Sequence, residues 1–435
     1  MTGPPINAGI TLQREVSTMA GVTRRSVLAA TVAAALIAIG GGARAQDTIK
    51  VGGLATLEGA FTVLGEDSMR GLNLALKEHN AMGGGKKIEL ITGSSNATPD
   101  SAVNAARKLV EQDGVQILIG PLSGDEGLAV KQYAKTQPQV TFINGTSAAQ
   151  DTTLRDPAPN FFRFTTDGAQ WQAGLGEYAY NEKGYKKIVT VAEDYSFPYT
   201  QVFGFMIGYC NAGGHVADKF WVPIGNKDFS TIVASIPDDI DAVYVALGGA
   251  DAVNFLSQYQ QGGGSKPMIG GSITVDQTIL GSKGPTKTYM VGTPSAGPIA
   301  DNWDDPRWKA FVAAYKAAYA DGFPSPSLFA HGYYVETSAM LAALDKVGGD
   351  LSDGQKKFRE ALTSLDLDTP TGKVTLDKNR QAVADIFLTE VAQGSDGNLY
   401  NKVVKVIPQV NQLLGMKEDM FLAMGSVSRD NPQCP

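Results

Sequence analysis

Two stretches decide the fold, VQILIGPLSG at residues 115–124 and VTFINGTS at residues 140–147. In each, a short apolar run typical of a buried strand leads into a loop of glycine and small hydroxyl residues, and a helix is expected to begin at Asp125. In open parallel α/β sheets, ligands bind at the carboxyl ends of strands, where the N-termini of the following helices present free N–H groups. We therefore predict that these two loops form a cradle for a carboxylate.

The rest of the chain repeats this strand-and-helix pattern. Alternation of short strands with amphipathic helices is typical of parallel sheets made of βα units. Helices are expected at 65–80, 306–321, 327–347 and 353–365, and antiparallel strands from 371 onward, with turns at 377–380 and 395–397. The expected parallel strands are 48–54, 87–92, 115–119, 140–143, 160–164, 187–191, 215–222, 242–247, 267–270 and 288–292.

The first 45 residues have the features of an export signal. Arg24 and Arg25 precede an apolar run that ends at Gly42, and Ala43-Arg44-Ala45 offers small residues at a cleavage point. This order of charge, apolar run and small residues predicts a twin-arginine export signal, residues 1–45, cleaved after Ala45. Met19 is an alternative start, and a membrane-anchoring helix is the alternative interpretation of the segment.

The net charge and the length of the remaining 390 residues limit the kind of protein that they can form. The leader holds four basic residues and one acidic residue, so its removal changes the net charge from −7 to −10, and such an acidic chain is not expected to bind nucleic acid. No later run of 18 apolar residues follows, so we expect a soluble protein of the periplasm. Single cores stop growing at roughly 250–300 residues, which predicts two domains.

The chain has two cysteines, Cys210 and Cys434. In an oxidising compartment they are expected to form a disulfide, which would tether the C-terminal tail, residues 428–435, to the helix near residue 210. Two unpaired thiols are the alternative.

With the order of elements established, the chain resembles the solute-binding proteins of ABC importers, in the branched-chain amino acid (Leu/Ile/Val-binding) family. The resemblance covers the chain that follows the leader and depends on the order and spacing of several short segments. These segments are 51–85, 113–123, Phe162-Arg163-Phe164, Asp194-Tyr195-Ser196-Phe197 and Asp228-Phe229-Ser230.

The resemblance implies the fold of the first class of periplasmic binding proteins, with two Rossmann-like α/β lobes, parallel sheets and three hinge crossovers. Lobe 1 would comprise 46–165 and 294–367, and lobe 2 would comprise 166–293 and 368–427. The crossovers would fall near 164–167, 292–295 and 367–372. A ligand would be trapped by closure about the hinge. A monomer without a cofactor would then deliver it to the permease subunits of an ABC importer.

The resemblance also places the ligand carboxylate on the two cradle loops. In the amino acid binders, such loops hold the carboxylate through a serine, a threonine and backbone N–H groups, which correspond here to Ser123, Gly124, Thr146 and either Ser147 or Ala148. Donors of this kind satisfy a desolvated carboxylate without a buried counter-charge. The alternative is that Ser123 and Thr146 only cap the helices that follow them.

The second lobe departs from the amino acid binders. Those proteins bind the ligand's ammonium group through an acidic residue in the loop after the strand that corresponds to 267–270, where this chain has Ser272. A buried ammonium without a carboxylate partner costs several kcal/mol, so an α-amino acid is not the expected ligand. Asp276 is close enough in sequence to substitute, which keeps an amino acid or amide as the alternative ligand.

A second departure concerns the size of the cleft. The branched-chain binders have an aromatic residue where this chain has Gly248-Gly249-Ala250, so more room is expected beside Gly249. Aromatic and apolar walls would suit a flat apolar ligand, although Tyr195 and Phe197 could equally be core residues. The ligand-facing walls would be formed by Phe61, Leu64, Tyr195, Phe197 and Tyr199.

Together these departures favour a carboxylate with an aromatic body, of the benzoate or phenylpropanoid type. In this respect the chain resembles the aromatic-acid (p-coumarate- and benzoate-type) members of the family. A ligand sensor that signals to a receptor would share the same fold and pocket, and the residues do not separate it from a transport protein. An enzyme is not expected, because His79, His215 and His331 have no metal-ligand spacing and no serine lies in a nucleophile-elbow motif.

Overall fold

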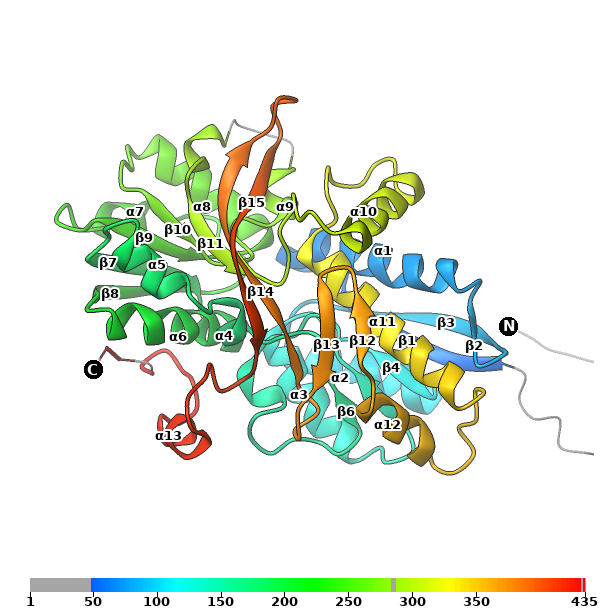
Figure 1. Ribbon diagram of the computed structural model, residues 1–435. Coiled ribbons are helices and arrows are strands. Elements are labelled where there is room, and N and C mark those ends of the chain that lie inside the picture. Colours follow the sequence, from blue (N-terminus) through cyan, green and yellow to red (C-terminus); the bar gives the residue numbers. More distant parts are fainter. Residues whose placement is uncertain (1–47, 283–286, 432, 435) are drawn as a thin grey trace, which may run out of the picture. The chain divides into compact units, whose positions relative to one another are not determined.

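The computed structural model describes residues 48–282, 287–431, 433 and 434. They form a mixed α/β fold of two lobes, each built around one sheet (Figure 1). The expected export signal at 1–45 lies outside these residues. Within the described ranges, no helix has both the length and the apolar character that a membrane span requires.

The first lobe contains a six-stranded sheet in the order β2-β3-β1-β4-β5-β6. β1 is parallel to both β3 and β4, and β4, β5 and β6 continue the parallel pairing, as the alternating pattern predicts. The carboxyl ends of β4 and β5 therefore lie side by side at one edge. The strands are β1 (Thr48–Thr56), β2 (Met82–Gly83), β3 (Lys86–Ser95), β4 (Ile117–Ile119), β5 (Thr141–Ile143) and β6 (Phe161–Phe162).

The second lobe has a larger sheet in the order β12-β13-β14-β11-β10-β9-β7-β8, and β15 pairs with β14. The five neighbouring strands β8, β7, β9, β10 and β11 pair in parallel. β14 runs antiparallel to β11, β13 and β15. The strands are β7 (Lys187–Glu193), β8 (His215–Val222), β9 (Ala242–Ala246), β10 (Met268–Gly270), β11 (Pro294–Gly297), β12 (Leu367–Thr369), β13 (Gly372–Leu376), β14 (Ala382–Gln393) and β15 (Leu399–Val410).

Helices cover both sheets, and the long α11 packs against α1 in the core of the first lobe. The α-helices of that lobe's βα series are α1 (Thr62–Glu78), α2 (Pro99–Arg107) and α3 (Gly124–Lys135). Those after the first crossover are α4 (Gly168–Trp171), α5 (Leu175–Asn181), α6 (Ser196–Asn211), α7 (Ser230–Ser235), α8 (Gly249–Gln261) and α9 (Gln277–Leu280). The later ones are α10 (Pro306–Ala318), α11 (Leu328–Lys346), α12 (Lys356–Thr363) and α13 (Glu418–Ala423). Short turns complete the set: η1 (Gly59–Phe61), the π-helical η2 (Lys108–Gln112), η3 (Gln150–Thr152) and η4 (Thr288–Met290).

One expected strand is wrong. Residues 288–292 form the 3-10 turn η4 and a loop, and the strand begins only at Pro294. Val291 is 48% exposed and Gly292 has a positive φ of 88°, so this apolar run neither is buried nor has an extended backbone. Proline as the first residue of β11 is tolerated because the ladder there loses a single N–H donor.

The positions and pairing of the strands show where the chain crosses from one lobe to the other. The first crossing leaves β6 and reaches α4, within the expected 164–167. The second was expected near 292–295, but 294–297 is strand β11 of the second sheet, so the chain leaves that sheet after Gly297. The third was expected near 367–372, but Leu367 and Val374 still pack in the core of the first lobe. The chain crosses within β14, which starts at Ala382 in that core and then pairs with β11 in the second sheet. The proposed bounds of the two lobes as a whole stay a prediction.

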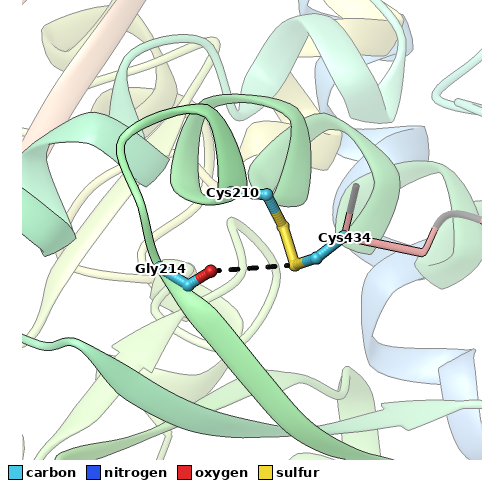
Figure 2. The surroundings of a disulfide bond; sticks show 3 residues. All are labelled: Cys210, Gly214 and Cys434. Atoms are coloured by element: carbon cyan, nitrogen blue, oxygen red, sulfur yellow. Dashed lines mark hydrogen bonds between the residues drawn. A yellow bond between two sulfur atoms is a disulfide. The ribbon is translucent and has the colours of Figure 1, made fainter.

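The C-terminal tail is held by a disulfide between Cys210 of α6 and Cys434, as expected (Figure 2). Sγ of Cys434 lies 3.9 Å from the carbonyl oxygen of Gly214. Ahead of the bond, Phe421 packs edge-on against Phe203 of α6. The tail is thus attached to the second lobe by an apolar contact and by a covalent bond.

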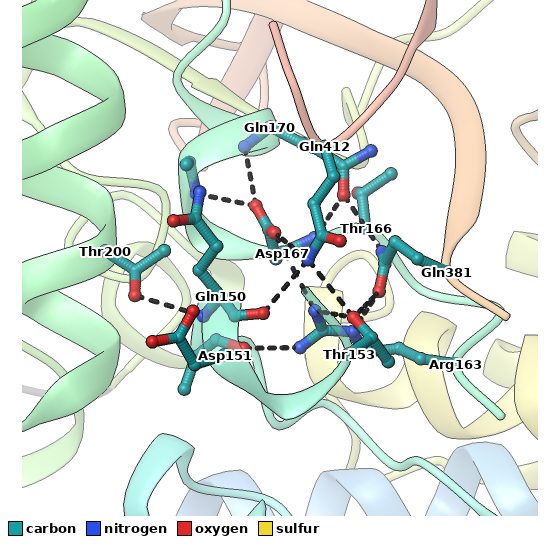
Figure 3. Close-up of polar contacts among 12 residues, drawn as sticks. Gln150, Asp151, Thr153, Arg163, Thr166, Asp167, Gln170, Thr200, Gln381 and Gln412 are labelled. Atoms are coloured by element: carbon teal, nitrogen blue, oxygen red, sulfur yellow. Dashed lines mark hydrogen bonds and ion pairs between the residues drawn. The ribbon is translucent and has the colours of Figure 1, made fainter. Parts of the chain in front are cut away.

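A buried arginine connects the first crossover to the cradle loop that follows β5. Figure 3 shows this arginine, Arg163, beside Thr153, Asp167 and Gln381. The side chain of Arg163 donates to the carbonyl oxygens of Ser147, at 3.2 Å, and Ala149, at 2.7 Å. It also donates to Thr153 Oγ1, at 2.8 Å, and to the amide oxygen of Gln381. Burial lowers the pKa of the Arg163 guanidinium, and the Asp167 carboxylate, 3.7 Å away, opposes this effect. Each of the three guanidinium nitrogens, Nε, Nη1 and Nη2, therefore donates to an acceptor, and the bonds from Nη1 hold the loop from Ser147 to Ala149.

Replacement of the disulfide tests the tethering of the tail. Cys434→Ser should lower the free energy of unfolding by about 2–4 kcal/mol, because the unfolded chain gains the freedom of a long open loop. Urea unfolding under non-reducing conditions measures the change. The double variant Cys210→Ser/Cys434→Ser should match the single variant, and an unchanged midpoint in both would contradict the tether.

The arginine can be tested by its nearest cationic substitute. Arg163→Lys keeps the charge but loses the planar fork of donors, so buried acceptors are left unpaired and stability should fall by about 3–5 kcal/mol. Arg155→Lys, at a half-buried arginine in the neighbouring loop, is the matched control and should cost about 1 kcal/mol or less. Equal urea midpoints for the two variants would contradict the special role of Arg163.

Candidate ligand-binding site

A narrow cavity, with about 10 Å³ of room for a water-sized sphere, lies between the loops of the two lobes. That is far below the volume of small-molecule sites, so side chains or lobes have to move apart before a small molecule can enter. The wall combines loop residues that follow β4, β5, β7 and β10 with residues of η1, α1, α3, α4, α6 and α11. The lining residues are Phe61, Leu64, Leu122, Ser123, Gly124, Thr146, Trp171, Tyr195, Phe197, Ile273 and Phe329.

Seven of the expected site residues are brought together here: Phe61, Leu64, Ser123, Gly124, Thr146, Tyr195 and Phe197. They come from both lobes, and in the sequence they are as much as 136 positions apart, from Phe61 to Phe197. The two cradle loops meet because β4 and β5 are adjacent and parallel. The polar lining residues Ser123, Gly124 and Thr146, called the polar end below, come from these two loops, and their role as a carboxylate cradle stays a prediction.

The hydrogen-bond donors of the polar end come from three residues. Gly124 is the first residue of α3, so its N–H has no partner within the helix and adds to the positive end of the helix dipole. Ser123, the N-cap residue, donates its hydroxyl to the carbonyl oxygen of Ala97 at 3.3 Å, a long bond that a better acceptor could replace. The N–H groups of Thr146 and Ser147 already donate to the carbonyl oxygen of Pro121, each at 3.3 Å.

Thr146 contributes a free hydroxyl. Its Oγ1 is buried and has no hydrogen-bond partner among the described residues. Its methyl group faces α11, where a Cβ built on Gly332 would lie 2.4 Å from Thr146 Cγ2. Because the methyl side is taken up by this contact, the hydroxyl is left for the cavity, and leaving such a group unpaired costs about 1–3 kcal/mol.

A buried carboxyl supports the cradle from behind. Glu126 accepts hydrogen bonds from Ser123 N, at 2.9 Å, Ala97 N, at 3.1 Å, and Thr56 Oγ1, at 3.0 Å. Burial raises the pKa of the Glu126 carboxyl, and these hydrogen bonds oppose the rise. Glu126 therefore connects the loop after β4 to Ala97 and Thr56 and orders it.

Aromatic rings make up much of the remaining lining. Trp171 and Phe197 meet edge to face at 5.4 Å between ring centroids. Tyr195 lies 6.1 Å from Phe61 and 6.2 Å from Phe197 by the same measure. Burial raises the pKa of the Tyr195 hydroxyl well above its usual value, so this ring stays neutral. Rings at these spacings favour an aromatic ligand beyond the area that it buries.

Three other expected site residues lie outside this lining. Ser147 Oγ points at α3, since a Cβ on Gly127 would lie 1.8 Å from it. Ser272 accepts a hydrogen bond from Gln201 Nε2 at 2.5 Å, and its neighbour Ile273 faces the cavity instead. Gly249 has a positive φ, and a Cβ there would lie 2.4 Å from the carbonyl oxygen of Ala60.

The space expected beside Gly249 is therefore filled by η1 of the first lobe. Tyr199 also lies away from the lining residues: its hydroxyl donates to Asp194, and its ring packs edge-on against Trp221. Among the residues that line the cavity, none carries an ionisable acid, lysine, arginine or histidine side chain.

The cavity contains four lining residues that the sequence did not indicate: Leu122, Trp171, Ile273 and Phe329. Leu122 and Ile273 adjoin residues that were expected in the site. Trp171 and Phe329 lie in helices whose patterns predict only burial, and no signal in the sequence distinguishes them from core residues. Trp171 is oriented by a hydrogen bond from its Nε1 to Thr166 Oγ1 at 2.8 Å.

Asp276, the alternative partner for a ligand ammonium, has both oxygens occupied. It accepts from Thr278 N at 2.9 Å and from Leu328 N at 2.8 Å. His331 is a buried residue of α11 whose Nε2 lies 3.1 Å from Thr371 Oγ1, and burial lowers the pKa of its imidazole to about 3. In the described ranges, no group of three or more His, Cys, Asp or Glu residues could hold a metal ion.

The lobes touch directly around the cavity. Ser196 N of α6 donates to Asp125 Oδ1 of α3 at 3.0 Å. A Cβ on Gly124 would lie 2.6 Å from Ser196 Oγ and 2.8 Å from Phe197 N. Together with the approach of Ala60 to Gly249, these contacts define a closed arrangement, and glycine at both positions permits it.

The comparisons agree with this fold. Residues 48–398 match the family model described as "Periplasmic binding protein". The chain is 26% identical over 389 residues to Leu/Ile/Val-binding protein homolog 6 of Brucella melitensis, covering 86% of this chain and 96% of that protein.

Two solved structures are similar to this chain. One is the ABC transporter substrate-binding protein from Sphaerobacter thermophilus, with 30% identity, a TM-score of 0.75, and 84% and 100% of the two chains covered. The other is the solute-binding protein of an ABC transporter from Rhodopseudomonas palustris BisB5 in complex with 3,4-dihydroxybenzoic acid, with 27% identity, a TM-score of 0.77, and 84% and 99% covered.

The match over most of the chain shows that this protein belongs to the periplasmic binding protein family. The two solved relatives place it with the binding proteins of ABC transporters, as the segments around the cradle suggest.

Gly124→Ala tests the close approach of the lobes. The added Cβ should hold the lobes apart, so small-angle X-ray scattering should give a larger radius of gyration. The stability of α3 should not fall, because alanine favours a helix over glycine by about 1 kcal/mol. Gly394→Ala, in a turn where a Cβ would meet only the exposed side chain of Asp396, is the control and should scatter like the original protein. Identical scattering from both variants would contradict the contact.

Proposed function

We propose that this protein binds a small carboxylate with an aromatic body, of the benzoate or phenylpropanoid type, and delivers it to an ABC importer by closure of its two lobes. The observation that carries the proposal is the composition of the lining of one cavity. The lining combines hydrogen-bond donors of the two cradle loops with five aromatic side chains, and no charged side chain lies among its residues.

The polar end suits a carboxylate. Ser123 Oγ, Thr146 Oγ1 and the N–H of Gly124 are donors that approach from two neighbouring loops. Charge-assisted hydrogen bonds to a carboxylate are roughly twice as strong as neutral ones. The N-terminus of α3 adds a favourable dipole without a buried cation. This arrangement stabilises a negative charge where no lysine or arginine lines the wall.

The same wall disfavours an ammonium group. An α-amino acid would bring a buried cation to a cavity without an acidic lining residue, at a cost of several kcal/mol. Asp276 does not offset that cost, because its two oxygens already accept hydrogen bonds from the N–H groups of Thr278 and Leu328. The names of the Brucella relatives favour an amino acid as the second candidate, whereas the 3,4-dihydroxybenzoic acid in the Rhodopseudomonas structure is an aromatic acid without an amine.

The proposal also covers the export of the protein, its location and its partners. Family members are periplasmic binding proteins. We infer export by the twin-arginine signal at 1–45, work as a monomer in the periplasm, and docking on the permease subunits of an importer. Binding requires no bond to be made or broken, so we propose no catalytic role and no cofactor.

Ligand binding can be tested by a thermal-shift screen of benzoate, 3,4-dihydroxybenzoate, cinnamate, p-coumarate, leucine and isoleucine. A ligand present at 100 times its Kd stabilises the protein by about 2.7 kcal/mol, enough to raise the melting temperature measurably. Aromatic acids should shift the melting temperature and the amino acids should not. Shifts with leucine and none with the aromatic acids would refute the proposed ligand class.

The role of Thr146 in holding the carboxylate is tested by Thr146→Val. The variant keeps the shape and removes the hydroxyl, so the Kd of the best ligand should rise about 10- to 100-fold in isothermal titration calorimetry. Thr190→Val is the matched control, because Thr190 of β7 also has a buried hydroxyl without a described partner but does not line the cavity. Equal Kd values for the two variants would count against the cradle.

A further inference from the structure

Asp276 joins the two lobes at the edge of the closed site. It follows β10 in the second lobe, is the N-cap residue of α9, and is 2% exposed. Its Oδ1 accepts the N–H of Thr278 at 2.9 Å, which satisfies its own helix. Its Oδ2 accepts the N–H of Leu328, the first residue of α11, at 2.8 Å. Since α11 packs against α1 in the first lobe, this hydrogen bond crosses from one lobe to the other.

The N-terminus of α11 needs that acceptor. The N–H of Ala330 is satisfied by Ser327 Oγ at 3.1 Å, and the N–H of Ser327 by Asp67 Oδ2 of α1 at 3.2 Å. The N–H of Leu328 has its partner on the opposite lobe. Opening of the lobes would therefore remove one of the acceptors at the positive end of a 19-residue helix.

The contact is close to the ligand. Phe329, the residue after Leu328, lines the binding cavity. Leu328 lines an adjoining cavity at the crossovers, which shares Thr146 and Trp171 with the binding cavity. A hydrogen bond that holds the start of α11 against the second lobe therefore holds one wall of the site in its closed position.

We propose that Asp276 is a positioning residue that latches the closed site, and that closure takes up a proton at this carboxyl. The proposal rests on the proposed binding function, because closure is the step that traps the ligand. Asp276 would act on affinity without touching the ligand.

The surroundings of Asp276 favour its protonated form in the closed state. Burial raises the pKa of its carboxyl to about 7; the hydrogen bonds from Leu328 and Thr278 oppose the rise, and the Asp67 carboxylate adds to it. Asp67 is in turn engaged by Arg70, at 3.2 Å, by Tyr315 and by Ser327. On the side of α9, Gln277 Nε2 donates to Asp301 Oδ2 at 2.8 Å. No cation contacts Asp276 within the described ranges.

The direction of the pH effect follows from these surroundings. When the lobes open, water reaches the carboxyl and its pKa returns toward the ordinary value of 3.8. The closed state then binds a proton more tightly than the open state does, so closure is most favoured at low pH. That advantage is lost as the pH rises from about 4 through about 7, and above that range the affinity becomes independent of this group.

Titration calorimetry with 3,4-dihydroxybenzoate between pH 5.5 and 7.5 tests the latch, because the probe's carboxylate stays ionised over that range. The Kd of the original protein should rise about tenfold across it. Asp276→Asn is neutral at every pH of this range, and its single amide oxygen can accept from Leu328 N or Thr278 N but not from both, so its Kd should be flat with pH whatever its absolute value.

Asp125→Asn, at the other carboxylate that crosses between the lobes, is the matched control and should keep the original pH slope. A flat profile in the original protein, or an unchanged slope in Asp276→Asn, would overturn the latch.

A second measurement separates the latch from the proposed function. If 3,4-dihydroxybenzoate binds at no pH, the proposed ligand is wrong, and the latch is then measured without ligand by small-angle scattering over the same pH range. A radius of gyration that grows with pH in the original protein but not in Asp276→Asn supports the latch. A radius that is constant with pH in both proteins overturns it.

Discussion

The buried guanidinium of Arg163 is the contact on which the site depends. It lies in the first crossover, and its donors hold the carbonyl oxygens of Ser147 and Ala149 and the amide of Gln381 near the third crossover. The loop that presents Thr146 is therefore hydrogen-bonded to the same guanidinium as Gln381. Because a buried arginine must have all its donors paired, the loop cannot move without breaking several charged hydrogen bonds. The cradle is rigid for this reason, and motion is left to the lobes.

Two buried carboxyl groups, of Glu126 and Asp276, lie near the cavity but do not line it. Glu126 stands behind Ser123 and orders the cradle, while Asp276 caps two helices on opposite lobes. Both carboxyls have raised pKa values because they are buried. Each is engaged by backbone N–H groups, so neither is free to hold a ligand cation. The lining therefore offers neutral donors without a charge, and the two buried acids are hydrogen-bonded to the loops and helices around it.

Glycine has a different role in the cleft from the one that the sequence suggests. The run from Gly248 to Ala250 predicts empty space for a larger ligand, but the carbonyl oxygen of Ala60 occupies the position that a side chain at Gly249 would take. Gly124 is similar, because Ser196 and Phe197 approach it from the other lobe. The small residues thus allow the lobes to approach each other. The room for the ligand is set instead by Trp171, Ile273 and Phe329.

The sequence by itself determined the class of fold, the paired cradle loops and the disulfide. Strand and helix periodicity is local, adjacent parallel strands bring their loops together, and two cysteines in an oxidising compartment allow one pairing. It also placed Ser123, Gly124 and Thr146 at the polar end, and it wrongly extended the apolar run at 288–292 into a strand. Only the tertiary structure decided which residues of the second lobe face the ligand. Ile273 rather than Ser272 lines the cavity, and Asp276 meets Leu328, because these contacts depend on how far the lobes close, a distance that no local pattern encodes.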